Sequence, residues 1–126
     1  MFNKLKCVVV TISAALLVAC GGGDSSSSPD YYGAVAVNRA NGQGGITANY
    51  TSQADANRDA LSNCGSGCEI AEQFHGAGLC AALAVGTNAW GSGQGSTKQN
   101  ASDRAVADCS SVGGKACAAV LAKCNG

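Results

Sequence analysis

Short apolar segments alternate with glycine-rich and polar turns between residues 31 and 126, and each apolar segment predicts one element of secondary structure. "YGAVAV", from residue 32, and "CAALAV", from residue 80, are bounded apolar runs that predict buried strands. "GITANYT", from residue 45, alternates apolar and polar side chains, as a half-buried strand does. A last strand is predicted at 68–74 and another at 117–124.

Each last strand is preceded by a segment with helical periodicity. Ser52 and Asp55 have the spacing of a capping box, which satisfies the first amides of a helix, and the second helix starts near Thr97. Apolar residues then follow one helical face: Ala56, Ala60, Leu61 and Cys64 in the first helix, and Ala101, Ala105, Val106 and Cys109 in the second. Because alanine carries a single methyl group, these faces allow each helix to approach a sheet closely.

The two halves of this pattern also match in sequence. The matching segments are "AVAV" at 34–37 with "ALAV" at 82–85, and "SQADANRDALSNC" at 52–64 with "TKQNASDRAVADC" at 97–109. We interpret them as a duplicated unit of strand, strand, helix and strand, with repeats at about 32–79 and 80–126. The expected fold class is α+β, in which both units form one mainly antiparallel sheet with two helices on one face.

The first 30 residues predict a membrane-tethered, exported protein. Residues 1–19 combine a basic start with an apolar run too short to span a bilayer, as a secretory signal peptide does. "LVAC", at 17–20, resembles a bacterial lipobox, which implies a lipid on Cys20 and cleavage before it. Residues 20–30 then form a flexible Gly/Ser linker. Gly21 after the cysteine resembles outer-membrane sorting, so the expected location is a lipid anchor in the outer membrane, facing the periplasm or the surface.

Six cysteines remain once Cys7 leaves with the signal and Cys20 takes a lipid. An even number in a small exported domain predicts a disulfide framework. The repeat suggests the pairs Cys64–Cys68, Cys109–Cys117 and Cys80–Cys124, among the many pairings that six cysteines allow. Zinc binding by Cys64 and Cys68 with His75 is the weaker alternative, because a second closely spaced cysteine pair is missing. We therefore predict no metal and no cofactor.

Charge and composition restrict the class of partner. Without the signal peptide, six basic residues face eight acidic ones, which argues against nucleic acid and against electrostatic binding to a membrane. Large apolar side chains are few, so the core is thin and depends on the disulfides.

Candidate chemistry is sparse. His75 is the single histidine, and a catalytic role would need a nucleophile and an orienting partner, so a loop residue is the simpler interpretation. Gly91, Gly93 and Gly95 leave one face of a strand bare beside Trp90. With Tyr50, this strand is a candidate surface for a sugar ring or a peptide, although the same bare backbone would also accept Trp90 or Tyr50 as core.

The order of these segments resembles an exported bacterial family, domain of unknown function 4189. The resemblance rests on "YGAVA" at 32–36, the helices that end in Cys64 and Cys109, "CAALAV" at 80–85 and the last cysteines, and it covers about residues 31–126. The family's last strand more often carries larger side chains than "CAAVLAK" does. The resemblance implies an architecture and no activity.

Two functions are compatible with these features. The favoured one is a non-enzymatic lipoprotein of the cell envelope, a binding or structural module tethered through Cys20 whose partner is another envelope protein or a cell-wall component. The alternative is a small periplasmic hydrolase, or a glycan-processing or glycan-binding domain, that uses His75 or Trp90.

Overall fold

Both halves of the chain fold in the order strand, strand, helix, strand. The computed structural model describes residues 30–126, so the predicted signal peptide, Cys20 and the linker before residue 30 lie outside the described residues. The first half comprises β1 (Tyr32–Asn38), β2 (Gly44–Tyr50), α3 (Gln53–Cys64) and β3 (Cys68–His75). The second half comprises β4 (Cys80–Thr87), β5 (Ala89–Gly95), α4 (Lys98–Ser111) and β6 (Lys115–Cys124).

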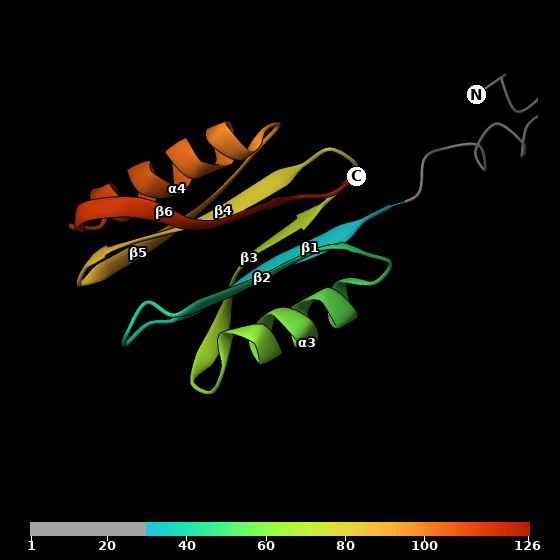
Figure 1. Cartoon of the computed structure of the whole chain (residues 1–126), viewed down its shortest axis with the longest axis horizontal. Coiled ribbons are helices and arrows are strands. Elements are labelled where there is room, and N and C mark those ends of the chain that lie inside the picture. Colours follow the sequence, from blue (N-terminus) through green and yellow to red (C-terminus); the bar gives the residue numbers. More distant parts are fainter. Residues whose placement is uncertain (1–29) are drawn as a thin grey trace, which may run out of the picture.

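Each half forms its own three-stranded antiparallel sheet, in the orders β2-β1-β3 and β5-β4-β6. The α+β class is confirmed, but the expectation of one sheet with both helices on one face is wrong. The two sheets are stacked between α3 and α4, so that one helix covers the outer face of each sheet (Figure 1).

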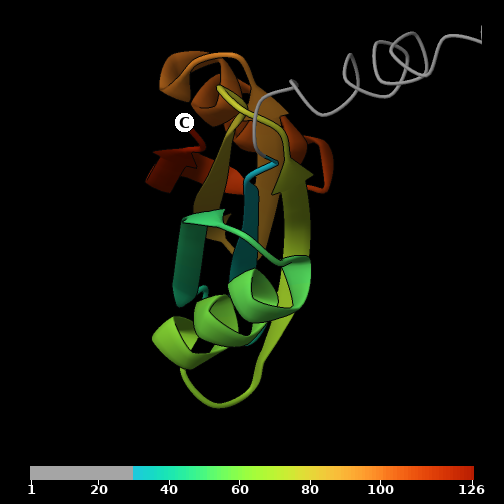
Figure 2. The ribbon, with the colours of Figure 1, turned by 90° about the vertical axis from the view of Figure 1, so that its right-hand side faces the viewer.

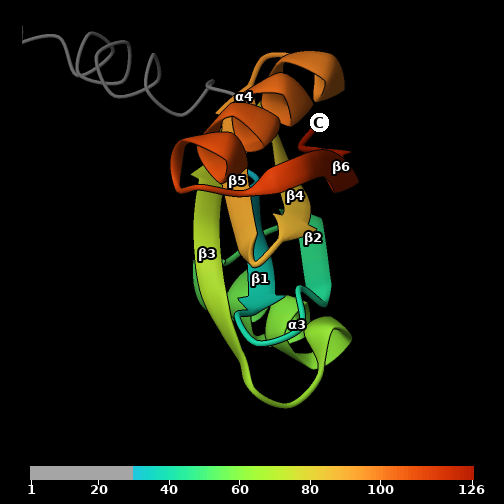
Figure 3. The same cartoon turned by 90° about the vertical axis from the view of Figure 1, so that its left-hand side faces the viewer.

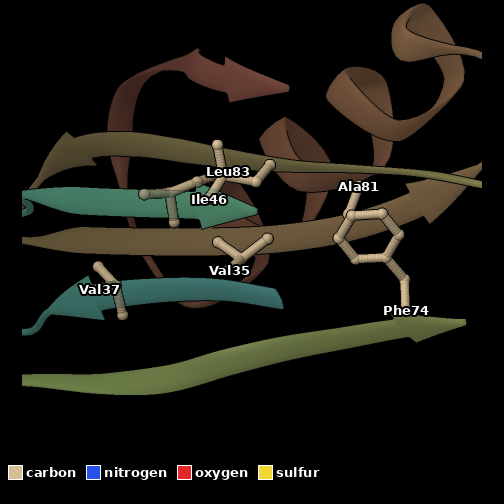
Figure 4. Close-up of a cluster of buried hydrophobic side chains, with 6 residues drawn as sticks. All are labelled: Val35, Val37, Ile46, Phe74, Ala81 and Leu83. Atoms are coloured by element: carbon tan, nitrogen blue, oxygen red, sulfur yellow. The ribbon is translucent and has the colours of Figure 1, made fainter. Parts of the chain in front are cut away.

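The side chains of the central strands explain the second sheet. On β1, Ala34 and Ala36 belong to the cluster under α3, whereas Val35 and Val37 point to the opposite side, where Leu83 of β4 meets them. A single sheet with helices on one face would leave those larger side chains in water. Burying them between two sheets removes both apolar faces from solvent (Figure 4).

The helices approach the sheets closely where a glycine meets an alanine. Ala60 of α3 and Ala105 of α4 are fully buried. A side chain at Gly45 would place its Cβ 2.7 Å from the Cys64 amide nitrogen, and one at Gly91 would lie 2.6 Å from the Ala105 carbonyl oxygen. Both distances are too short for a real Cβ contact, so the two outer layers depend on these glycines.

All strands run between two ends of the sandwich, which we call the N-terminal pole and the hairpin pole (Figure 1). The N-terminal pole holds the start of β1 and the end of β6. There the buried Asn125 side chain donates to the Tyr31 carbonyl oxygen at 3.1 Å and accepts from the Asn49 amide at 2.8 Å. The hairpin pole holds the β1–β2 loop and the β4–β5 turn. Figure 2 views the sandwich from the N-terminal pole, and Figure 3 views it from the hairpin pole.

Three disulfides join the six cysteines, in the pairs that the repeat suggested. Cys64–Cys68 and Cys109–Cys117 each connect a helix end to the next strand at the hairpin pole. Cys80–Cys124 connects β4 to β6 at the N-terminal pole, where the two residues face each other across the strand pair. In residues 30–126, no helix is long and apolar enough to cross a membrane, and no His, Cys, Asp and Glu side chains cluster as metal ligands.

Candidate functional site at the hairpin pole

The β1–β2 loop is built by asparagine side chains that hydrogen-bond to nearby backbone. Asn38 Oδ1 accepts from the Ala40 amide at 2.8 Å, and Asn41 Oδ1 accepts from the Gln43 amide at 2.9 Å. The Asn38 side-chain amide also donates to the Ser66 carbonyl oxygen at 3.2 Å, which ties the loop to the α3–β3 connection. These hydrogen bonds favour a single turn conformation of the loop.

A pocket of about 270 Å³ lies between this loop and the β4–β5 turn. Its lining consists of Arg39, Ala40, Asn41 and Gly42 from the loop, and Val85, Gly86, Asn88 and Ala89 from the second half. Gly42 has a φ of 77°, and a Cβ there would lie 2.7 Å from Val85 Cγ1. Glycine thus lets the loop both turn and rest against β4.

Arg39 is the charged side chain of the pocket lining. Its Nε donates to a carboxylate oxygen of Glu69, the second residue of β3. The centre of its guanidinium lies 5.9 Å from the centroid of the Trp90 ring, within the range of a cation–π contact. The Arg39 side chain is nevertheless 71% exposed, so it is held in place from one side and open to solvent from the other.

A second cation lies at the same pole. Lys115 opens β6 and pairs with Thr87 at the end of β4. Its carbonyl oxygen would lie only 2.6 Å from a Cβ at Gly86, which places the start of β6 against the pocket lining. Arg39 and the backbone of Lys115 thus place two basic residues at this pole, with Glu69 as the acidic partner of Arg39.

The ligand surface predicted on β5 is not assembled. α4 covers the bare face of the strand, because a Cβ at Gly93 would lie 2.7 Å from the Ala105 amide nitrogen and one at Gly95 would lie 2.7 Å from Asn100 Cβ. Trp90 packs instead against the core between the sheets. The bare face therefore seats α4, and the Trp90 ring lies elsewhere.

Tyr50 lies away from Trp90, at the N-terminal pole, where it pairs with Tyr32 of β1. Its hydroxyl donates to Asp59 Oδ2 of α3 at 2.7 Å. This hydrogen bond is the main reason why the pKa of Tyr50 is raised and the pKa of Asp59 is lowered. Tyr50 therefore connects the first sheet to its own helix and does not contribute to the pocket.

His75 also lies at the N-terminal pole. Its ring stacks on Tyr32 with centroids 4.5 Å apart, and its Nε2 lies 3.4 Å from Asp30 Oδ1. An acidic neighbour is thus present, but the pocket lies at the opposite end of β3, beyond Glu69. The six cysteines of the domain are joined in disulfides, so none supplies a thiolate nucleophile to His75.

Comparison with known families matches residues 32–124 to the family described as Domain of unknown function (DUF4189). The chain belongs to this family. The DUF4189 match contains both sheets, both helices and all three disulfides, so both poles are parts of the family domain. No curated protein matches the chain, and no solved structure does.

The sequence did not single out the pocket of this DUF4189 domain. Arg39 is a lone arginine in "NRANGQG", whose asparagines and glycines predict only a turn. Trp90, which lies within cation–π range of Arg39, was predicted to belong to a ligand surface on the glycine face of β5. That face is covered by α4. The turn residues were the available signal, because a loop rich in Asn and Gly often carries function when a rigid scaffold positions it.

Proposed function

We propose that this DUF4189 protein is a non-enzymatic lipoprotein of the cell envelope, a binding module tethered through lipid on Cys20. Its partner would be another envelope protein or a cell-wall component, and not nucleic acid. The observation that carries the proposal is that the pocket is lined by the β1–β2 loop and the β4–β5 turn. These turns lie at the pole opposite the start of β1 (Figure 1).

The length of β1 sets the distance between these poles. The strand has seven residues, which extend about 23 Å at roughly 3.3 Å per residue. The predicted linker from Cys20 would join the domain at Asp30, so the pocket would lie at the pole farther from the tether. Lipid attachment would give the two-chain anchoring that holds a protein stably on a bilayer.

The shared element order and sheet order of the two halves support a duplicated unit as the origin of the domain. The halves differ at the hairpin pole. The β1–β2 connection spans residues 39–43, whereas Asn88 alone separates β4 from β5. The longer loop of the first half supplies the wall that closes the pocket over the second half.

The tether is tested by replacing Cys20. The Cys20→Ala variant should move from the membrane fraction to the soluble fraction of the envelope, because the anchoring chains are lost. A variant that changes Cys7 instead serves as the control, because that residue leaves with the signal peptide. Persistence of Cys20→Ala in the membrane fraction would contradict the proposed anchor.

The binding role is tested through Trp90, the single tryptophan of the chain, whose fluorescence reports on the hairpin pole. Soluble cell-wall fragments should change this fluorescence in a saturable way. A flat titration with the fragments would count against a cell-wall partner and direct the search to envelope proteins.

A further inference from the structure

We propose that the pocket at the hairpin pole binds a small anionic group, a carboxylate or a phosphate, through the guanidinium of Arg39. This inference rests on the proposed binding function and names the chemistry of its ligand.

The hydrogen-bond donors at the pocket favour an anionic ligand. The bond to Glu69 uses only Arg39 Nε, and within residues 30–126 the two terminal amino groups of the guanidinium make no hydrogen bond. Those groups carry four N–H donors in a plane that matches the two oxygens of a carboxylate or phosphate. Asn41 directs its Oδ1 to the Gln43 amide, which leaves its side-chain NH2 as a further donor.

The charge of the pole favours the same ligand. Lys115 lies beside the Gly86 side of the pocket and Arg39 lies on the loop side, while Glu69 is the acidic partner of Arg39. A second basic residue near the pocket adds to the attraction of Arg39 for an anion at low ionic strength.

The size of the pocket limits the ligand. A volume of about 270 Å³ lies at or below the lower end of the usual range for small-molecule sites. It suits the end of a peptide or a phosphate group rather than a large cofactor. Trp90 lies below the guanidinium and limits its movement, which lowers the entropic cost of positioning the fork.

Glu69 competes with the ligand for Arg39. Replacement of Glu69 by glutamine frees the Nε donor and removes the negative charge, so anions should bind more tightly. Removal of Arg39 has the opposite effect. A pair of opposite changes from two neighbouring substitutions distinguishes a specific site from general attraction to a positive surface.

The test titrates the full chain, in neutral detergent micelles at low salt, by Trp90 fluorescence and by calorimetry. The probes are N-acetyl-alanyl-alanine with a free carboxylate, the same dipeptide as its terminal amide, and inorganic phosphate. We expect saturable binding of the carboxylate or phosphate and none of the amide. R39Q should weaken binding at least about tenfold, R39K should retain part of it, and E69Q should strengthen it about two- to fivefold.

The matched control is R58Q, which removes another exposed arginine that pairs with carboxylates, on α3. It should leave the affinity unchanged. Preference for phosphate would assign the site to phosphate-bearing lipids or wall polymers, and preference for the carboxylate would assign it to peptide ends.

Equal binding of the amide probe, an unchanged affinity in R39Q or R39K, or weaker binding in E69Q would overturn the proposal. A flat titration by a protein that still carries lipid on Cys20 would reject the anion site and leave the tether intact. Anion binding by a protein that carries no lipid on Cys20 would support the anion site and reject the tether.

Discussion

The two long edges of the sandwich have equivalent places in the fold but opposite chemistry. Val35 of β1 has Ile46 and Glu72 as its strand neighbours, and Leu83 of β4 has Ser92 and Leu121. Ile46 therefore corresponds to Ser92, and Glu72 corresponds to Leu121. Along the β2–β6 edge the matched side chains join the apolar core.

Along the β3–β5 edge, hydrogen bonds replace that packing. Glu72 accepts from Ser92 Oγ at 2.7 Å and from the side-chain amide of Gln94, which also donates to the Gln73 carbonyl oxygen. We infer a division of roles between the edges. Apolar burial on the β2–β6 edge contributes most of the stability, and the polar edge determines which strands of the two sheets meet, because hydrogen bonds require specific partners.

The two halves also differ in how the outer strand is joined to the central strand at the N-terminal pole. Cys80 and Cys124 are joined by a disulfide at the end of the β4–β6 pair, whereas Tyr32 and His75 occupy the corresponding ends of β1 and β3 and stack their rings. Each half thus fastens its outer strand to its central strand at the N-terminal pole, one covalently and one by stacking. This stacking gives His75 a structural role.

Loss of the Cys80–Cys124 bridge should have the largest effect. The bridge closes a segment of 44 residues, so the C80A/C124A variant should lose about 4 kcal/mol of unfolding free energy in the chain-entropy description. Urea unfolding measures this loss, with C109A/C117A as the comparison. That shorter segment, of 8 residues, should cost about 2.5 kcal/mol. A larger loss from the shorter bridge would contradict this assignment.

Placing glutamate, the residue of the polar β3–β5 edge, at Leu121 on the apolar β2–β6 edge should destabilise the domain almost as much as loss of the bridge. Leu121→Glu places a carboxylate beside the core without the donors that Glu72 has, at a cost of about 3 kcal/mol. The L121Q variant, which carries no charge, is the control for desolvation of the ionised group, and urea unfolding of both at pH 7 gives the comparison. Equal stability of L121E and the native chain would show that the two edges are interchangeable.

Placing leucine at Glu72, on the polar edge, should lower the unfolding free energy only slightly. Glu72→Leu removes the acceptor from Ser92 and Gln94, but both are half-buried and reach water, so the loss should be about 1 kcal/mol. Adding Ser92→Ile should recover most of that loss by apolar contact between the new side chains. A loss in E72L as large as that in L121E would remove the proposed division of roles.

Removal of the stacked ring should be smaller still. His75→Ala should cost about 0.5 kcal/mol, because the His75 side chain is 52% exposed. Thermal unfolding measures this change, with Asp30→Asn as a control for the contact between Asp30 and His75. Loss of an envelope phenotype or an activity in H75A at unchanged stability would instead favour the hydrolase alternative.

The smallest effect concerns the Tyr50–Asp59 hydrogen bond and depends on pH. The lowered pKa of Asp59 contributes stability above the ordinary carboxyl pKa of about 3.9, and this stability is lost as the pH falls through the lower folded value. The raised pKa of Tyr50 contributes below about pH 10 and is lost above it. Tyr50→Phe should therefore lower the melting temperature slightly at pH 7 and by less at pH 2, as thermal scans would show. An equal decrease at both pH values would contradict the assignment.

The sequence predicted the element order and the α+β class because turns, caps and apolar runs are local signals. The same apolar runs also contained an indication of the second sheet, which the sequence analysis did not predict. "YGAVAV" is apolar on both faces, which means that both faces are covered, but the pattern does not say whether a helix or a second sheet covers each one.

The pocket at the hairpin pole was beyond such local signals. The pocket joins residues 39–42 to residues 85–89, and the contact between these turns exists only once the two sheets are stacked. The bare face of Gly91, Gly93 and Gly95 was visible, but an empty strand face has the same sequence pattern under a helix as under a ligand.

The most direct test of a tethered, disulfide-bonded module is the intact mass of the protein from its native membrane, before and after reduction with alkylation. We expect a mature chain that begins at a lipid-modified Cys20, with six thiols that become alkylated only after reduction. An unmodified Cys20, or thiols that react before reduction, would contradict it.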